Sequence, residues 1–174
     1  MAAVVPATQA SNPLIDGVLS GLRWNGPEVT YSFPAQANFY GSKYGSGEPQ
    51  KHFEPLNELQ IAATRSIFQM ISVVTNLTVT EIEETASTHA DIRLAMSGLA
   101  EIGWTYTLDE VGAGGDAWFS NSSGRYNAPV MGNFAFWTFL HEIAHTLGLK
   151  HAHEDGSYGR VPVDLDSMEF SVTT

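Results

Sequence analysis

Residues 141–151 read HEIAHTLGLKH, which places three histidines, a glutamate and a glycine at the spacing H-E-x-x-H-x-x-G-x-x-H. On a helix, His141 and His145 lie four residues apart on one face, where two neutral imidazoles can bind one metal ion. Glu142 projects beside them without having to be a ligand. Such a pair is common in helices, so the rest of the string decides what it does.

A third ligand requires the chain to turn after the helix. Gly148 permits that turn, because glycine adopts the left-handed conformation that ends many helices. His151 can then return to complete a three-histidine site, which leaves a fourth position for water, as in catalytic zinc sites. A metal-free histidine cluster is the alternative, but five fixed positions recur by chance in a chain of this length well below roughly once in ten thousand. The sequence therefore predicts one zinc ion bound by the three histidines.

The helix that carries this string is predicted to begin after Asn133, a good N-cap, and to end at Gly148. Residues 102–108 and 116–120 before it are predicted to be extended. The intervening run 112–115 is rich in glycine but lacks the G-x-G-x-x-G order and precedes a strand-like segment, so we reject a nucleotide-binding loop.

An earlier helix is predicted over residues 53–74, where apolar residues recur at helical spacing and form a core-facing stripe. Strand 28–33 precedes it, and strands 77–82 and 91–96 follow. Strand, helix and strand at these lengths favour a right-handed crossover with parallel pairing.

The remaining segments carry few signals of regular structure. Residues 1–13 are small and suggest a loose lead-in, residues 21–26 carry turn residues, and residues 35–51 are typical of a long loop. The start lacks a basic segment and its apolar run is broken by Pro6, so no secretory signal peptide is predicted there. No stretch is long enough to span a membrane.

Composition limits the classes of function. A chain of 174 residues with 43% hydrophobic and 16% charged residues suits one globular domain. The net charge of −11 argues against nucleic acid and anionic membranes as partners, since both carry negative charge. The absence of cysteine excludes disulfides, zinc–thiolate sites and a thiol that blocks the metal.

Further segments carry a resemblance to a known family. The runs ADIRLAM (90–96), GDAWFSNSSGRYNAPVMGNFAFWTFLHE (115–142), DGVLSGLRWNGPEVTYSFP (16–34) and DSMEFSV (166–172) resemble serralysin-type metalloproteases of the metzincin group. The likeness extends from about residue 16 to residue 172. An astacin- or matrixin-like enzyme is disfavoured, because those groups rely on disulfides or a thiol switch.

The resemblance implies an α/β (α+β) fold: a twisted, mixed, mostly parallel five-stranded sheet with two long helices, one carrying HExxH. It implies a zinc endopeptidase of broad preference, secreted by bacteria, that hydrolyses peptide bonds in proteins through a zinc-bound water. His141, His145 and His151 match the family's zinc ligands and Glu142 its general base. Residues 21–174 would form the catalytic domain, and residues 1–20 a lead-in or short propeptide.

Substrate binding is also implied by the resemblance. Residues 116–120 match the family's edge strand, along which an extended peptide would add as a further strand. Asp116, Ala117, Trp118 and Phe119 are accordingly the expected substrate-binding residues. Protein or peptide substrates are the expected partners, without nucleic acid or membrane, and the oligomeric state is not indicated.

The sequence departs from the family near its C-terminus. Where the family has the methionine of a turn beneath the zinc, alignment on residues 170–172 places Thr173, and Met168 lies five residues too early. We therefore also expect a shortened C-terminal subdomain without glycine–aspartate repeats or an export signal. The alternative function is a zinc-binding domain that is catalytically weak or inactive.

Two further features concern metal ions. His153 stands near the third ligand, where the family usually has a proline directly after it, and is a potential competing imidazole. Residues 155–166 contain three aspartates in no calcium-loop pattern, so the sequence leaves a calcium cofactor open.

Overall fold

A five-stranded sheet frames the protein in the computed structural model, which describes residues 2–109 and 112–174. Its strands lie in the order β4-β3-β5-β7-β6; β6 runs antiparallel to β7, and the other neighbours are parallel. This confirms the predicted mixed, mostly parallel sheet. The strands are β3 (Glu28–Ser32), β4 (Thr78–Glu81), β5 (Ile92–Ser97), β6 (Gly103–Thr105) and β7 (Ala117–Ser120).

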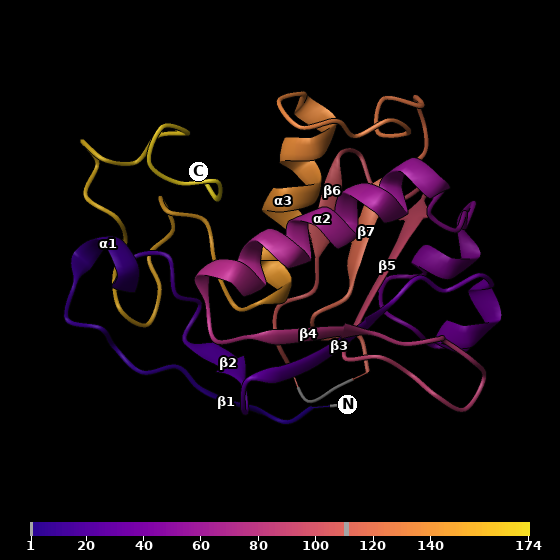
Figure 1. Ribbon diagram of the computed structural model, residues 1–174, viewed down its shortest axis with the longest axis horizontal. Coiled ribbons are helices and arrows are strands. Elements are labelled where there is room, and N and C mark those ends of the chain that lie inside the picture. The colour runs from indigo at the N-terminus through magenta and orange to yellow at the C-terminus, as the bar shows by residue number, and fades with distance from the viewer. Residues whose placement is uncertain (1, 110–111) are drawn as a thin grey trace.

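Two long helices, α2 (Glu58–Val74) and α3 (Phe134–Thr146), contact one another beside the sheet (Figure 1). Helix α2 begins later than predicted, because Glu54 is hydrogen-bonded to Met96 as an isolated strand pair. Its start is fixed by a capping box, in which the side chains of Asn57 and Gln60 each accept a hydrogen bond from the other residue's backbone N–H.

Both faces of the sheet are covered. Successive residues of a strand point to opposite faces, so neighbouring residues belong to different clusters. Leu94 and Phe119 face the core shared with α2 and α3. Their neighbours Ala95 and Trp118 face a second cluster. That cluster is completed by residues in and near the short 3₁₀ helices η1 (Ala37–Tyr40) and η2 (Glu48–Gln50), so the long loop predicted for residues 35–51 covers the second face.

The N-terminal region is more ordered than expected. Strand β1 (Val4–Pro6) pairs antiparallel with β2 (Leu22–Trp24), and α1 (Pro13–Asp16) lies between them in the chain. The predictions of a loose lead-in over 1–13 and a mere turn over 21–26 are therefore wrong. Strands of three residues are too short to show an alternating pattern. Across the described residues, every helix is too short or too polar to cross a membrane.

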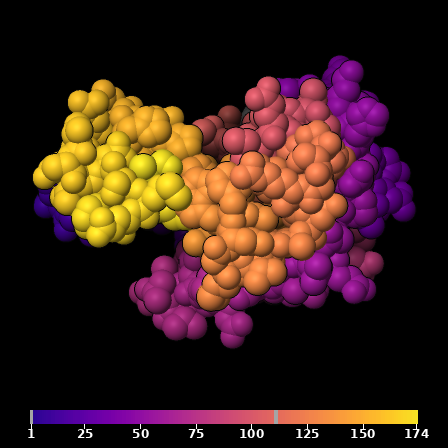
Figure 2. Space-filling view, turned by 90° about the horizontal axis from the view of Figure 1, so that it is seen from above, coloured from indigo at the N-terminus to yellow at the C-terminus, as the bar shows by residue number. Residues whose placement is uncertain are grey.

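The residues after α3 form no further regular helix or strand in the described chain. They make a lobe at one end of the molecule, near α1 (Figure 1), and a hollow separates part of this lobe from the body in Figure 2. Hydrogen bonds from Ala152 N to Thr173 O (3.1 Å) and from Val161 N to Ala152 O (3.0 Å) tie the lobe together.

Candidate metal centre and cleft

Helix α3 holds the first two histidines of the string. The Asn133 side chain caps its start by accepting from Phe136 N at 2.8 Å. At its other end Gly148 has a φ of +96°, and a Cβ there would lie 2.5 Å from Leu22 O. Both the backbone conformation and the close approach therefore require glycine.

The third histidine is positioned by the N-terminal segment. Ser20 N donates to Gly148 O at 3.0 Å, and Lys150 N donates to Val18 O at 2.8 Å. These bonds fix the chain on either side of Leu149 just before His151. Sequence reasoning missed this support, because backbone hydrogen bonds between residues far apart in the chain leave no sequence signal.

The three imidazoles converge on one point. The Nε2 atoms of His141 and His145 are 3.0 Å apart, and His151 Nε2 lies 3.2 Å and 3.3 Å from them. On the opposite side of the rings, Nδ1 of His141 donates to Val172 O and Nδ1 of His145 to Leu149 O, each at 2.7 Å. Nδ1 of His151 lies 2.9 Å from Glu154 Oε1.

These partners decide which ring nitrogen is free. Carbonyl and carboxylate oxygens only accept, so each neutral imidazole carries its proton on Nδ1 and a lone pair on Nε2. Three lone pairs 3.0–3.3 Å apart repel one another unless a cation lies between them. Zn–N bonds of about 2.0–2.1 Å in a tetrahedron put ligand nitrogens about 3.3 Å apart. The donor set therefore fits zinc.

Burial favours the neutral rings that a metal needs. Desolvation lowers the pKa of His145 to about 4 and also lowers the pKa of His141. The buried Glu142 shows the opposite shift, because desolvation raises its pKa to about 7. The hydroxyl of Thr105 lies 2.9 Å from Glu142 Oε2 and partly opposes this rise.

His141, His145, His151 and Glu142 line a cleft of about 400 Å³. Ile102, Phe134 and Trp137 form an apolar part of its wall, and Trp137 lies with its ring centroid 4.9 Å from that of His141. Strand β6 borders the same cleft, and a Cβ on Gly103 would lie 3.0 Å from Glu142 Cγ. The edge of the sheet therefore lies directly against the glutamate.

The predicted edge strand is wrong. Strand β7 lies between β5 and β6, and Asp116, Ala117, Trp118 and Phe119 are all buried. The Asp116 carboxylate accepts from the buried Arg93 at 2.6 Å and from the Tyr44 hydroxyl at 2.7 Å, so it holds the loops together. The edge strand beside the three histidines is β6.

The C-terminal lobe supplies the hydrogen-bond acceptor of the His141 ring. The Val172 carbonyl is its hydrogen-bond acceptor, and the neighbouring Thr173, at the position of the family's methionine, is buried. Met168 is exposed. The Tyr158 hydroxyl donates to Ala7 O at 2.6 Å.

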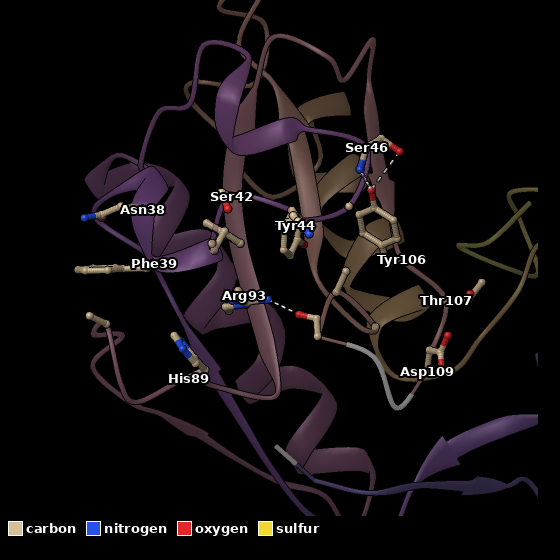
Figure 3. A pocket seen from close by; sticks show the side chains of 18 residues that line it. Asn38, Phe39, Ser42, Tyr44, Ser46, His89, Arg93, Tyr106, Thr107 and Asp109 are labelled. Atoms are coloured by element: carbon tan, nitrogen blue, oxygen red, sulfur yellow. Dashed lines mark hydrogen bonds between the residues drawn. The ribbon is translucent and has the colours of Figure 1, made fainter.

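A larger cavity, about 890 Å³, is lined in part by Tyr106 and Thr107. Figure 3 shows Arg93 and His89 on one side of it and Tyr106, hydrogen-bonded to Ser46, on the other. It lacks convergent metal ligands among the described residues. The chemistry of the side chains, not the size of the cavity, therefore identifies the smaller cleft as the candidate site.

Comparison with known proteins gives a consistent result. No family model matches the sequence. The chain is 29% identical over 167 residues to the serralysin of Proteus mirabilis, covering 83% of this chain and 33% of that protein. It is 26% and 27% identical to serralysins A and G of Dickeya chrysanthemi, covering 86% and 87% of this chain. The chain spans about a third of the length of these curated relatives. The chain is therefore similar to serralysins over most of its own length, and this similarity supports a serralysin-type metalloprotease.

Proposed function

We propose that the protein is a zinc-dependent endopeptidase that hydrolyses peptide bonds in proteins or peptides. The observation that supports this best is the convergence of three unprotonated Nε2 atoms within 3.0–3.3 Å, beside a buried glutamate. The family resemblance supports action outside a bacterial cell.

Zinc held by His141, His145 and His151 would supply Lewis acidity, which polarises a carbonyl and makes water more acidic. Glu142 then acts as the base that takes a proton from the attacking water and as the acid that returns it to the leaving amine. A pKa of about 7 suits both roles, because the carboxyl can take and release a proton near neutral pH.

Strand β6 is the proposed substrate-binding edge. Ser120 N donates to Ile102 O at 2.9 Å and Tyr106 N to Asp116 O at 3.0 Å, so these residues of the 102–106 run face β7. By the alternation of an antiparallel ladder, the backbone groups of Gly103 and Thr105 point outward. An extended peptide could pair there, directly beside Glu142. Main-chain pairing would give affinity with little dependence on sequence.

The apolar wall supports a preference for bulky apolar side chains near the scissile bond. Phe134, Trp137 and His141 follow one another on one face of α3, with Phe134 and Trp137 stacked at 5.5 Å. Ile102, half exposed, lines the same cleft. A side chain in this part of the cleft would remove apolar surface from water.

A second candidate is a zinc-binding domain with weak or no catalysis. Thr173 favours it, because a threonine stands where the family has its methionine, next to the Val172 carbonyl that orients His141. This candidate predicts zinc binding without hydrolysis of any peptide.

The test is hydrolysis of casein and of a library of quenched peptides. Activity should disappear with a zinc chelator, return with zinc, and be lost in Glu142→Gln, which keeps the size of the side chain. The exposed Glu83→Gln serves as the matched control and should keep activity. Zinc binding with no cleavage by the wild type would favour the inactive domain, and failure to bind zinc would contradict both candidates.

A further inference from the structure

A second group of metal ligands lies on the loop that carries the third histidine. It consists of His151, His153 and Glu154, which we call the 151–154 cluster. One ligand atom from each residue lies within 4.8 Å of the others. The rings of His151 and His153 are nearly parallel, at an angle of 14° with centroids 5.3 Å apart.

His151 can serve two sites because its nitrogens lie on different edges of the ring. Nε2 faces His141 and His145, whereas Nδ1 lies 2.9 Å from Glu154 Oε1. His153 is exposed and does not line the cleft of about 400 Å³. His153 is therefore not one of the residues proposed to bind the first zinc ion.

We propose that the 151–154 cluster binds a second zinc ion, or a similar divalent transition metal ion, more weakly than the three-histidine site. Two imidazoles and a carboxylate are a common donor set for zinc. Zinc holds such donors about 3.3 Å apart. His151 Nδ1 and Glu154 Oε1 already lie 2.9 Å apart, so His153 is the residue that must adjust, which an exposed loop residue can do. This rearrangement and the exposure account for the weaker binding.

The second ion acts on the first through His151. When it binds, the Nδ1–H bond breaks, the proton leaves to solvent, and the freed electron pair of Nδ1 binds the ion. The hydrogen bond from Nδ1 to Glu154 is lost, and such a bond keeps a metal-binding imidazole oriented and basic. The ion also adds positive charge at the rim of the cleft, which Glu154 and His151 line. Excess zinc should therefore slow hydrolysis, an effect that rests on the proposed function, whereas the binding itself does not.

The experiment is a calorimetric titration of the 174-residue protein with zinc, with native mass spectrometry to count bound ions. Wild type should bind one ion tightly and a second more weakly. His153→Gln should keep the first binding event and weaken the second at least about tenfold. His52→Asn is the matched control: His52 is exposed and has a φ of +53°, which asparagine accepts. This variant should titrate like wild type.

Hydrolysis gives a second measurement. Excess zinc should inhibit wild type and His52→Asn but leave His153→Gln active. Identical second binding events in His153→Gln and wild type, or the absence of a second event in wild type, would overturn the second site. Loss of the first, tight event in wild type would instead contradict the proposed function.

Discussion

The Thr105 hydroxyl donates a hydrogen bond to Glu142 Oε2 at 2.9 Å. Among the described residues, it is the one side chain that hydrogen-bonds to this carboxylate. It comes from the edge strand, whose backbone we propose binds the substrate. One residue thus links substrate position to the orientation of the base. A base must lie within hydrogen-bond reach of the proton it abstracts, so its orientation affects the rate of the chemical step.

Thr105→Val should lower kcat by about tenfold, a part of the effect of a general base. Valine keeps the branched shape but cannot donate, and the backbone that binds substrate is unchanged, so KM should move little. Because the Thr105 hydrogen bond lowers the pKa of Glu142, its loss should raise that pKa further and shift the acid limb of the rate to higher pH. Thr105→Ser should restore both quantities. Equal pH–rate profiles for the valine variant and wild type would contradict this role.

At the residue scale, the convergence of His141, His145 and His151 could be predicted from their spacing. The hydrogen-bond partners of their rings could not. The acceptors of their Nδ1 atoms are two backbone carbonyls and one carboxylate. A carbonyl acceptor is the same for every residue type, so no sequence pattern identifies it. Glu154 is three residues from His151, and this spacing is the one signal that could have been read.

Helix α3 lines the cleft with one face and packs on the sheet with another. One carries Phe134, Trp137 and His141 toward the cleft. The other packs on the sheet, where Phe139 and Phe119, both fully buried, stack with centroids 3.8 Å apart and planes 2° apart. The packing of the second face sets the distance between α3 and the sheet, and hence the position of the histidines on α3.

Phe139→Ala should reduce the free energy of unfolding by about 3–5 kcal/mol, because it removes a buried ring and leaves a cavity beneath α3. Denaturation in urea measures the change. Val73→Ala on the exposed side of α2 is the control and should change stability by about 0.5 kcal/mol or less. A loss below about 1 kcal/mol in the phenylalanine variant would show that the stack does not anchor the helix.

Trp137→Ala should weaken the preference for bulky apolar residues near the scissile bond. We expect the ratio of kcat/KM for a phenylalanine peptide to that for the matching alanine peptide to fall about tenfold. Phe170→Ala, an exposed aromatic residue of the C-terminal lobe, should leave the ratio unchanged. An unchanged ratio in Trp137→Ala would place specificity elsewhere in the cleft.

The strands could be predicted as segments, but their order could not. Residues 102–108 and 116–120 both show extended character, and periodicity does not say which lies at an edge. One signal was available: Ala117, Trp118 and Phe119 form a continuous apolar run, typical of a strand buried on both faces. Gly103, by contrast, allows the close approach of Glu142 that the edge position requires.

Over the whole molecule, the N-terminal and C-terminal segments of the described chain both support the three-histidine site. The Lys150 ammonium group donates to the carbonyls of Gly17, His151 and Glu154. Val172 orients His141 from the other side. The bond from Lys150 to Gly17 joins residues 133 positions apart and the bond from His141 to Val172 residues 31 positions apart, so local sequence patterns could not predict them. They imply that metal binding and the stability of the whole fold are coupled.

This coupling predicts how the metal-free protein responds to acid. The folded pKa of His145 is about 4 and that of His141 is also lowered, whereas an unfolded histidine titrates near 6.5. Between these values the unfolded chain binds protons that the two folded histidines exclude, so the stability contributed by these rings is lost as pH falls from about 6.5 toward 4. Glu142, whose pKa is raised to about 7, contributes in the opposite sense over part of this range. Zinc that binds only the folded state should raise Tm, and this rise should shrink over the same range, because protons compete for Nε2.

Thermal melts with zinc and with a chelator at several pH values measure both effects. The metal-free wild type should lose Tm between pH 6.5 and 4 more steeply than His145→Gln, which lacks one of the titrating rings. The same variant should lose most of the zinc-dependent rise in Tm. A Tm that zinc leaves unchanged at neutral pH would separate folding from the three-histidine site, and equal pH slopes for the two proteins would show that His145 is not held neutral by the fold.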